Sequence, residues 1–320
     1  MSVLPVGSNS DFESIIKERV HIVAHRSCSQ DLSDPCMTKY EPFEQQIQSM
    51  GKSADRAGIP KRNQHLFTKL PNDIYENKTW ERHVQPGVKS RGHWFWKSAI
   101  MVWLMKNGKF QPGDLVLYLD GDHWNFLERY LLDQHENGIL ASIFGTRGDE
   151  STVTCDVIGS VRQDGPLDCE RILTKGDVFR RFNVSLDDPE FVDSEQIFST
   201  FLGFRMGEKT HELISQWELL ASDFDLIEWD SKSKHGPDPP HLQTSQADQS
   251  LWSMLLKASQ KKSDGKVHVG SVLRKCDSNW KMNSKVKRLM NKVLVPLYVE
   301  SNETCSGRQT SETAESEVMD

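Results

Sequence analysis

One stretch of the sequence constrains the fold more than any other, GDLVLYLDGDHWNFLERYLL at positions 113–132. Its apolar run LVLYL, at 115–119, has the length and composition of a fully buried strand. The run ends on two carboxylates separated by a glycine, Asp120 and Asp122, and residues 124–136 then have the apolar spacing of a helix. A buried strand followed by a helix predicts a βα unit of a parallel sheet.

The rest of the chain continues this alternation of strands and helices. We predict a first strand at 20–24 and a helix within 93–109 that ends at the Asn107-Gly108 pair. Further helices are predicted within 173–184, 209–224 and 247–259, a strand or a short helix plus strand within 194–206, and a polar, Pro-rich loop over 230–246. The sequence therefore predicts an α/β sandwich around a mostly parallel sheet.

The length of 320 residues suffices for one large α/β domain. We place that domain at 17–298, after a flexible start at 1–16 and before an acidic, Ser- and Thr-rich tail at 299–320 that we expect to be disordered. No segment reaches the roughly 18 apolar residues of a membrane helix, and the first residues lack the pattern of a signal peptide. The sequence as written therefore predicts a cytoplasmic location, or the Golgi lumen if an anchor has been removed.

Charge and cysteine content narrow the range of partners. The net charge of −7 argues against nucleic acid, which needs a basic surface. Residues 257–292 hold eleven Lys or Arg and two Asp, which indicates either a solvated face or a basic surface for an anionic ligand or a peripheral membrane contact. No CxxC pair occurs among the six cysteines, and three glycosylation sequons, at Asn77, Asn183 and Asn302, permit a secretory lumen without establishing it.

The carboxylate pair predicts a metal site. Residues i and i+2 of an extended segment point the same way, so Asp120 and Asp122 can face one ligand, and ligands bind at the carboxyl ends of strands in open α/β sheets. Two close carboxylates repel each other unless a cation lies between them, and oxygen ligands favour Mg²⁺ or Mn²⁺ together with phosphate oxygens. The structural alternative is that Asp120 caps the next helix and Asp122 is a solvated turn residue.

Two chemistries use a strand that ends in D-x-D. In haloacid-dehalogenase-like phosphohydrolases the first Asp is a nucleophile, but Thr or Val commonly follows the second Asp, whereas His123 and Trp124 follow here. That motif also lies near the start of its domain. In glycosyl transfer the pair holds a divalent ion on the diphosphate of a nucleotide sugar. A nucleotide-binding strand precedes it by about a hundred residues, which the strand at 20–24 matches.

Three segments resemble one family. The stretch RGHWFWKSAIMVWLMKNGKFQPGDLVLYLDGD at 91–122 is similar to the G-x-W-x-W-K-P and Y-L-D-x-D segments of capsular-polysaccharide-type glycosyltransferases. TKGDVF at 174–179 resembles their K-R-D-x-F segment, and ADQSLWSMLL at 247–256 their H-D-Q-S-x-x-S-x-L segment. Order and spacing agree over roughly residues 18–258. In three places the family residue is replaced: Ser98 stands for Pro, Gly176 for Arg and Ala247 for His.

The resemblance implies a GT-A-like, three-layer α/β/α fold and a metal-dependent transfer of sugar from a nucleotide-diphosphate donor to a glycan or other hydroxyl acceptor. Asp122 would bind Mn²⁺ or Mg²⁺ directly. Asp120 would bind the metal through a water molecule, or bind hydroxyl groups of the ribose or the sugar. Asp248 would bind sugar hydroxyls or act as the base, and Glu195 is the second candidate for the base. The implied donor-binding residues are His25, Arg26, Arg91, Trp94, Trp96, Lys97, Asp177 and Gln249, with His241 or His268 in place of the missing His.

Each of these roles has a structural alternative. Asp248 and Asp177 also suit the first turn of a helix, where a carboxylate is favourable. The tryptophans around Lys97 also suit a hydrophobic core, with the lysine solvated. Besides the glycosyltransferase and the phosphohydrolase, the replacements at Ser98 and Ala247 leave open a glycan-binding relative that has lost catalysis.

Overall fold

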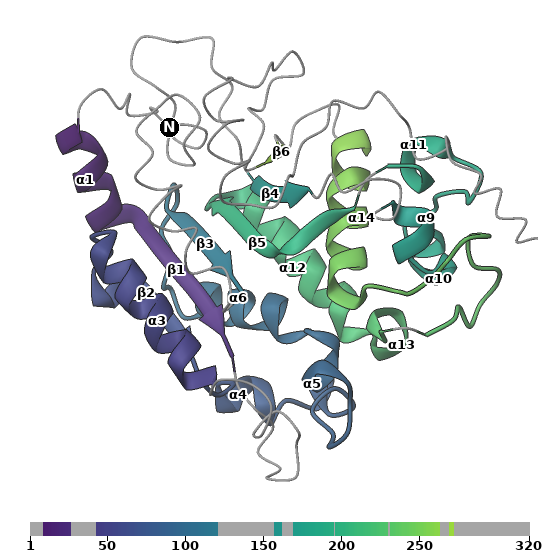
Figure 1. Cartoon of the computed structure of the whole chain (residues 1–320), viewed down its shortest axis with the longest axis horizontal. Helices are drawn as coiled ribbons and strands as arrows, with labels where there is room; N and C mark the ends of the chain where they lie inside the picture. Colours follow the sequence, from purple (N-terminus) through teal and green to yellow (C-terminus); the bar gives the residue numbers. More distant parts are fainter. Residues whose placement is uncertain are drawn as a thin grey trace, which may run out of the picture.

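The structure is a computed structural model of the chain, and it describes residues 9–26, 43–120, 157–161, 169–194, 196–229, 231–262 and 269–271. Figure 1 shows the helices and strands. The strands are β1 (Val20–His25), β2 (Gln64–Phe67), β3 (Leu115–Leu119), β4 (Val157–Val161), β5 (Ile197–Arg205) and β6 (Val269–Ser271). The longer helices are α1 (Asn9–Arg19), α3 (Phe43–Arg56), α6 (Trp96–Lys106), α12 (Glu208–Ser222) and α14 (Ala247–Lys262). The short helices are α4 (Asn72–Tyr75), α5 (Ser90–His93), α9 (Glu170–Leu173), α10 (Gly176–Arg181), α11 (Pro189–Val192) and α13 (Phe224–Ile227), and 3-10 turns lie at Lys61–Asn63 and Lys78–Trp80.

The strands of the described residues form one mixed sheet in the order β2-β1-β3-β5-β4-β6. β1 pairs in parallel with both β2 and β3, so the carboxyl ends of these three strands share one edge. β5 runs antiparallel to β3 and to β4, and β4 is parallel to β6. The start of β5 therefore lies at the same edge as the end of β3, with Phe201 opposite Leu119.

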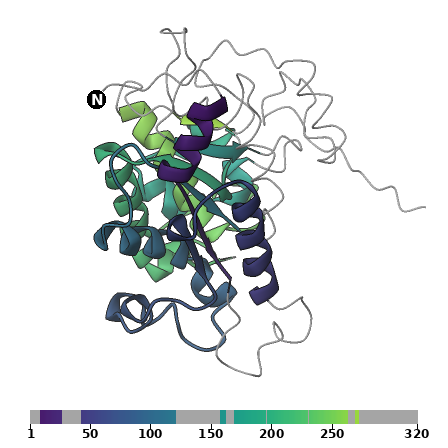
Figure 2. The same ribbon diagram turned by 90° about the vertical axis from the view of Figure 1, so that its left-hand side faces the viewer.

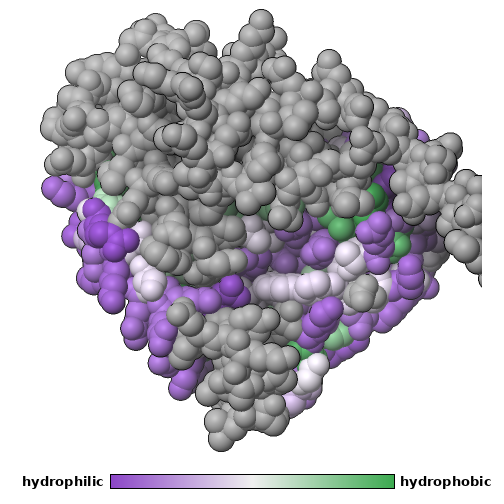
Figure 3. Space-filling view, viewed as in Figure 1, coloured by the Kyte–Doolittle hydropathy of each residue, from purple (hydrophilic) through white to green (hydrophobic). Residues whose placement is uncertain are grey.

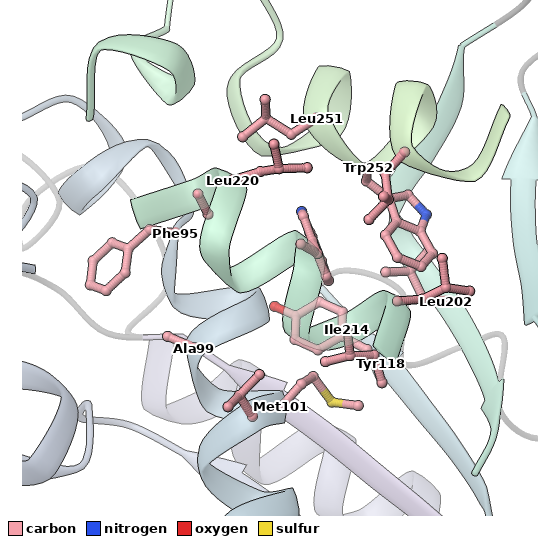
Figure 4. Close-up of a cluster of buried hydrophobic side chains, with 14 of the residues drawn as sticks. Phe95, Ala99, Met101, Tyr118, Leu202, Ile214, Leu220, Leu251 and Trp252 are labelled. Atoms are coloured by element: carbon pink, nitrogen blue, oxygen red, sulfur yellow. The ribbon is translucent and has the colours of Figure 1, made fainter. Parts of the chain in front are cut away.

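Helices cover both faces of the sheet, and the side chains of β1 and β3 alternate between two hydrophobic cores. Leu115, Leu117 and Leu119 of β3 face the core that includes residues of α1 and α3. Val116 and Tyr118 face the larger core, which α6, α12 and α14 complete. Figure 2 shows the dark blue α3 and the green α12 on opposite sides of the sheet, and Figure 4 shows Ala99, Ile214 and Trp252 in the larger core.

The predicted fold class is confirmed at the level of an α/β protein. The strands predicted at 20–24 and 115–119 are present as β1 and β3, and the strand predicted within 194–206 is β5. α6 ends where the sequence indicated: Asn107 Nδ2 donates to Trp103 O at 2.8 Å, and Gly108 has the left-handed φ of 63° that favours glycine. The helix predicted at 124–136 lies outside the described residues.

The N-terminal segment differs from the prediction. Residues 1–16 were expected to be a flexible start, but α1 begins at Asn9, and Ile15 and Ile16 are buried with residues of β1 and α3. The sequence did not predict this helix because polar residues surround the two adjacent isoleucines. Their burial is the physical reason for a helix here, since most helical stability in proteins comes from packing of an apolar face.

The described surface offers little apolar area. Tyr75 and Leu219 are its exposed large hydrophobic side chains, and the described part of the face in Figure 3 is mostly hydrophilic. None of the helices in the described ranges combines the length and the apolar composition that a membrane-spanning segment requires.

Candidate functional site

Three charged side chains from distant parts of the sequence meet at the edge where β3 ends. Lys97 lies in the first turn of α6, Asp120 directly follows β3, and Asp248 lies in the first turn of α14. Lys97 Nζ lies 3.4 Å from Asp120 Oδ2 and 3.1 Å from Asp248 Oδ2. The lysine also donates to Ser199 Oγ at 3.0 Å, and Ser199 Oγ donates to Asp248 Oδ2 at 2.6 Å. We call Lys97, Asp120, Ser199 and Asp248 the Lys97 cluster.

Strand register and helix packing bring these residues together. Asp120 N donates to Thr200 O at 2.9 Å, which continues the β3–β5 pairing by one residue and places Ser199 next to the end of β3. α14 is fixed against the start of β5 because Ile197 N donates to Ser253 Oγ at 2.8 Å. The carboxylate of Asp248 therefore faces Ser199 and Lys97. Its contacts with the described residues do not include a hydrogen bond accepted from the backbone of its own helix.

The cluster is buried and carries an excess of negative charge. Lys97 is 2% exposed, Asp248 3% and Asp120 9%. Burial alone would lower the pKa of Lys97, but the charges of Asp120 and Asp248 outweigh it and raise that pKa, so the ammonium stays charged. One ammonium cannot neutralise two carboxylates. Burial, with the charge of Asp120 acting in the same direction, raises the pKa of Asp248 to about 6 against the opposing effect of Lys97 and Ser199.

Tyr118, the fourth residue of β3, is fully buried and contacts the Lys97 cluster from the hydrophobic core. Its hydroxyl donates to Asp120 Oδ1 at 3.3 Å. Burial, and then the charges of Asp120 and Asp248, raise the pKa of Tyr118 well above its usual value, so the phenol remains a hydrogen-bond donor. Tyr118 and Ser199 were not among the predicted site residues. Tyr118 was assigned to the core by the strand pattern, and a single Ser inside an apolar strand gave no signal of its own.

Titration of Asp248 should make the stability of the protein depend on pH. Because its folded pKa lies above the unfolded value, its contribution is full below about pH 4 and is lost as the pH rises through 6. The relevant quantity is the difference between the free energies of unfolding of the parent and of Asp248→Asn. We expect this difference to fall by on the order of 2 kcal/mol between pH 4 and pH 7. Urea unfolding of both proteins across this range in the presence of EDTA measures the difference. A flat difference would contradict the raised pKa.

The predicted nucleotide-binding residues of β1 lie at the same edge. His25 is the last residue of β1, and its ring centroid lies 4.5 Å from that of Trp96, which is itself buried. The positive charge of Arg26 acts on Tyr118, where it opposes the rise in pKa. The parallel pairing of β1 with β3 explains this placement, since it brings the ends of both strands to one edge.

Lys97 occupies surroundings that the sequence did not indicate, whereas Trp94 packs against the larger core, as its structural alternative predicted. The alternatives for Lys97 were a phosphate ligand and a solvated residue, whereas its ammonium is buried and paired with carboxylates. Trp94 does not join the Lys97 cluster. It is half-buried, has a left-handed φ of 63°, and its ring lies 4.4 Å from that of Trp229.

Gln249 is buried next to Asp248 but points to a second polar network. Its Nε2 donates to Gln196 Oε1 at 2.6 Å. His241, one of the two proposed substitutes for the missing histidine, is exposed in the loop before α14, and His268 lies outside the described residues. Ala247 itself has a left-handed φ of 47° at the start of α14.

Asp177 holds a loop in place. Its carboxylate accepts from the backbone N–H groups of Lys234 at 2.6 Å and His235 at 3.1 Å, and from Arg180 Nη2 at 2.5 Å. Burial raises the pKa of this carboxyl, but these hydrogen bonds outweigh it and lower the pKa below its usual value. Asp238 adds a contact from the loop side, since its carboxylate accepts from Gly176 N at 2.9 Å. In the described structure Asp177 thus anchors the Pro-rich loop to the start of α10.

The loop lies so close to α10 that it leaves no room for a side chain at position 176. This explains why Gly176 occurs at the position where the similar family segment has Arg. A Cβ at position 176 would lie 2.0 Å from the carbonyl oxygen of Pro237. We expect Gly176→Ala to lower the free energy of unfolding by about 2 kcal/mol, because the loop or α10 must shift. Gly207→Ala is the matched control, since nothing lies within 4 Å of that Cβ. Equal melting temperatures of the two variants would contradict the close packing of this loop.

Part of the predicted site lies beyond what the structure describes. Asp122 and Glu195 are outside the described residues, and so is the side chain of Arg91, whose backbone is in α5. Among the described residues there is no group of three or more His, Cys, Asp or Glu arranged to hold a metal. Asp120 nevertheless suits a hard divalent cation, because it is a carboxylate at the edge of a cluster whose single ammonium leaves one negative charge uncompensated.

Comparison with known proteins adds no relative, because no family model, curated protein or solved structure matches the chain significantly. The features of the chain that bear on its function are therefore the geometry of the Lys97 cluster and the motifs of the sequence.

Proposed function

We propose that this chain is a GT-A-like, metal-dependent glycosyltransferase that moves a sugar from a nucleotide-diphosphate sugar to a hydroxyl group of a glycan, lipid or protein. One observation carries the proposal. Lys97, Asp120 and Asp248 come from two of the three segments that resemble this family, separated by more than a hundred residues, and they form one buried cluster at the carboxyl end of β3. A coincidental similarity of separate segments gives no reason for their charged residues to meet.

The position of the cluster also supports the proposal. Ligands of open α/β sheets bind at the carboxyl ends of the strands, and His25, Arg26 and Asp120 lie there. Asp120 and Asp122 would hold Mn²⁺ or Mg²⁺, which neutralises the diphosphate as it leaves. In the transfer the bond between the anomeric carbon and the diphosphate oxygen breaks with its electron pair on the diphosphate, and the acceptor oxygen forms the new bond and loses its proton.

The residues of the chain have distinct roles in this proposal. Asp248 presents a carboxylate to the sugar or accepts the proton, and a pKa near 6 is a useful value for a proton acceptor near neutral pH. Lys97 keeps that carboxylate in place and lowers the cost of burying it beside Asp120. Tyr118 donates to Asp120 Oδ1, the oxygen that Lys97 does not contact, and Ser199 donates to Asp248 Oδ2, which Lys97 also contacts.

Ligand binding tests the proposal directly. We expect UDP or GDP together with Mn²⁺ to stabilise the protein by about 2 to 4 kcal/mol at saturating concentration. Asp122→Asn should abolish this metal-dependent stabilisation and leave the melting temperature of the free protein unchanged. Equal binding of nucleotide and Mn²⁺ by the variant and the parent would refute the role of the carboxylate pair.

Product analysis separates the three functions considered from the sequence. A glycosyltransferase forms a glycosylated product, a phosphohydrolase releases inorganic phosphate, and a glycan-binding relative does neither. An aspartyl-phosphate at Asp120 detected by borohydride labelling, or a beryllium fluoride adduct of the Asp120 carboxylate that mimics it, would replace the present proposal by the phosphohydrolase.

A further inference from the structure

A second buried polar network adjoins the Lys97 cluster beneath the start of α14. It links the short helix α9, the residue before β5 and the first three turns of α14. Figure 1 shows α9 beside α14. Its side chains are fully buried apart from Gln249, which is 7% exposed, and the half-buried Lys257. They are Glu170, Thr174, Gln196, Gln249, Ser250, Ser253 and Lys257.

Glu170 sets the polarity of this network because an ionised carboxylate only accepts hydrogen bonds. Its Oε1 accepts from Lys257 Nζ at 2.6 Å and from Ser253 Oγ at 2.5 Å. Its Oε2 accepts from Thr174 Oγ1 at 2.5 Å and from Gln196 Nε2 at 3.3 Å. The amide nitrogen of Gln196, and not its oxygen, must therefore face Glu170.

Two hydroxyl groups reinforce this orientation of the Gln196 amide. Thr174 Oγ1 lies 3.0 Å from Gln196 Nε2, and its own proton is donated to Glu170. Ser250 Oγ lies 3.2 Å from Gln196 Nε2, and its proton is donated to Leu173 O at 2.7 Å. The nitrogen of Gln196 is thus surrounded by three acceptors, and a flipped amide would place its oxygen against all of them.

The orientation of Gln196 in turn determines that of Gln249. Gln196 Oε1 is left to accept, and Gln249 Nε2 donates to it at 2.6 Å. Because Nε2 of Gln249 faces Gln196, its Oε1 points away from Gln196. Among the described residues, none donates a hydrogen bond to this oxygen. The next residue toward the N-terminus is Asp248, whose carboxylate belongs to the Lys97 cluster.

We propose that Glu170 and Gln196 are positioning residues that turn the Gln249 amide so that its oxygen accepts a hydrogen bond from a hydroxyl group of the donor sugar. This inference rests on the proposed function and adds to it the basis of sugar recognition. Asp248 and Gln249 then present neighbouring acceptors, a pair that selects a sugar with free hydroxyl donors over an analogue that lacks one, because an unpaired buried acceptor costs free energy. Gln249 contacts the ligand, whereas Glu170 acts only through Gln196.

Glu170→Gln tests the chain of amides at its origin. Lys257 and Ser253 still require an acceptor at Oε1, so the new NH₂ group faces Gln196 and favours the reversed orientation of both glutamines. Gln249 then presents NH₂ to the sugar. Gln249→Met, which keeps the length of the side chain and removes its polar atoms, tests the same acceptor if Glu170→Gln does not fold. Glu212→Gln, an identical change at an exposed glutamate of α12, is the control.

The measurement compares binding of a nucleotide diphosphate with binding of its sugar ester by calorimetry in Mn²⁺. The probes are UDP and GDP, with UDP-glucose, UDP-galactose, UDP-N-acetylglucosamine and GDP-mannose. We expect Glu170→Gln and Gln249→Met to weaken binding of the sugar ester by about tenfold and to leave binding of the free diphosphate within about twofold of the parent. Glu212→Gln should change neither.

Three outcomes count against the inference, and they have different consequences for the proposed function. If the parent binds UDP and GDP but both variants bind the sugar ester as the parent does, the positioning role is wrong and the proposed function stands. If the parent binds none of the six compounds, the proposed function fails and the inference fails with it. Equal weakening of diphosphate and sugar ester would mean that the network only maintains the fold, which also overturns the positioning role.

Discussion

Lys97→Met is expected to lower the free energy of unfolding by about 3 to 5 kcal/mol, on the order of 10 °C in melting temperature. The change keeps the volume of the side chain but leaves Asp120 and Asp248 buried beside each other without a cation. Removal of one partner of a buried ion pair is costly because the remaining charge is neither solvated nor compensated. Thermal and urea unfolding at pH 7 measure the effect.

Lys61→Met provides the matched control. Lys61 Nζ forms an ion pair with Asp55 Oδ2 at 2.8 Å, shorter than either ion pair of Lys97, but the two side chains are 73% and 47% exposed. Exposed pairs contribute little, so we expect a change of less than about 1 kcal/mol. If both variants lose the same stability, the Lys97 cluster is not the buried charge cluster described above.

The elements of the fold were predictable where one local pattern dominates. The apolar run of β3 and the spacing of apolar residues in α6 gave the bounds of these elements closely, because each element is buried over most of its length. α1 was missed because its stabilisation comes from two isoleucines that pack on β1 and α3, a contact that no local window of the sequence contains.

The candidate site divides in the same way. Asp120, Asp248 and Lys97 could be chosen from motifs, but their ion pairing could not, because Lys97 meets the two carboxylates only through the register of β3 on β5 and the packing of α14. Ser199 has a role only in that geometry. Apart from Gln249, the second polar network gave no signal either, since Glu170, Gln196 and several Ser or Thr residues on three elements resemble solvated positions until their burial is known.

Asp248→Asn is expected to reduce turnover by about a hundredfold or more while the protein keeps its fold and its affinity for the nucleotide diphosphate. Asparagine can still accept from Ser199 and Lys97 through its oxygen, so the positions of these side chains are held nearly constant. What is lost is the negative charge and the ability to accept a proton. The measurement is the rate of sugar transfer at saturating donor, with circular dichroism and diphosphate binding as checks of the fold.

Asp114→Asn separates catalysis from the general cost of removing a buried charge. Asp114 is also buried, forms an ion pair with Arg19 and lies 3.3 Å from His21 Nε2, but it is at the opposite end of β3 from Asp120. We expect this variant to lose stability and to keep its turnover within about twofold. Full activity in Asp248→Asn would show that the Lys97 cluster only stabilises the fold, and Glu195 would then be the next candidate for the base. A large loss of turnover in Asp248→Asn alone would assign its carboxylate to the reaction. Both variants remove one buried charge, but they remove it at opposite edges of the sheet.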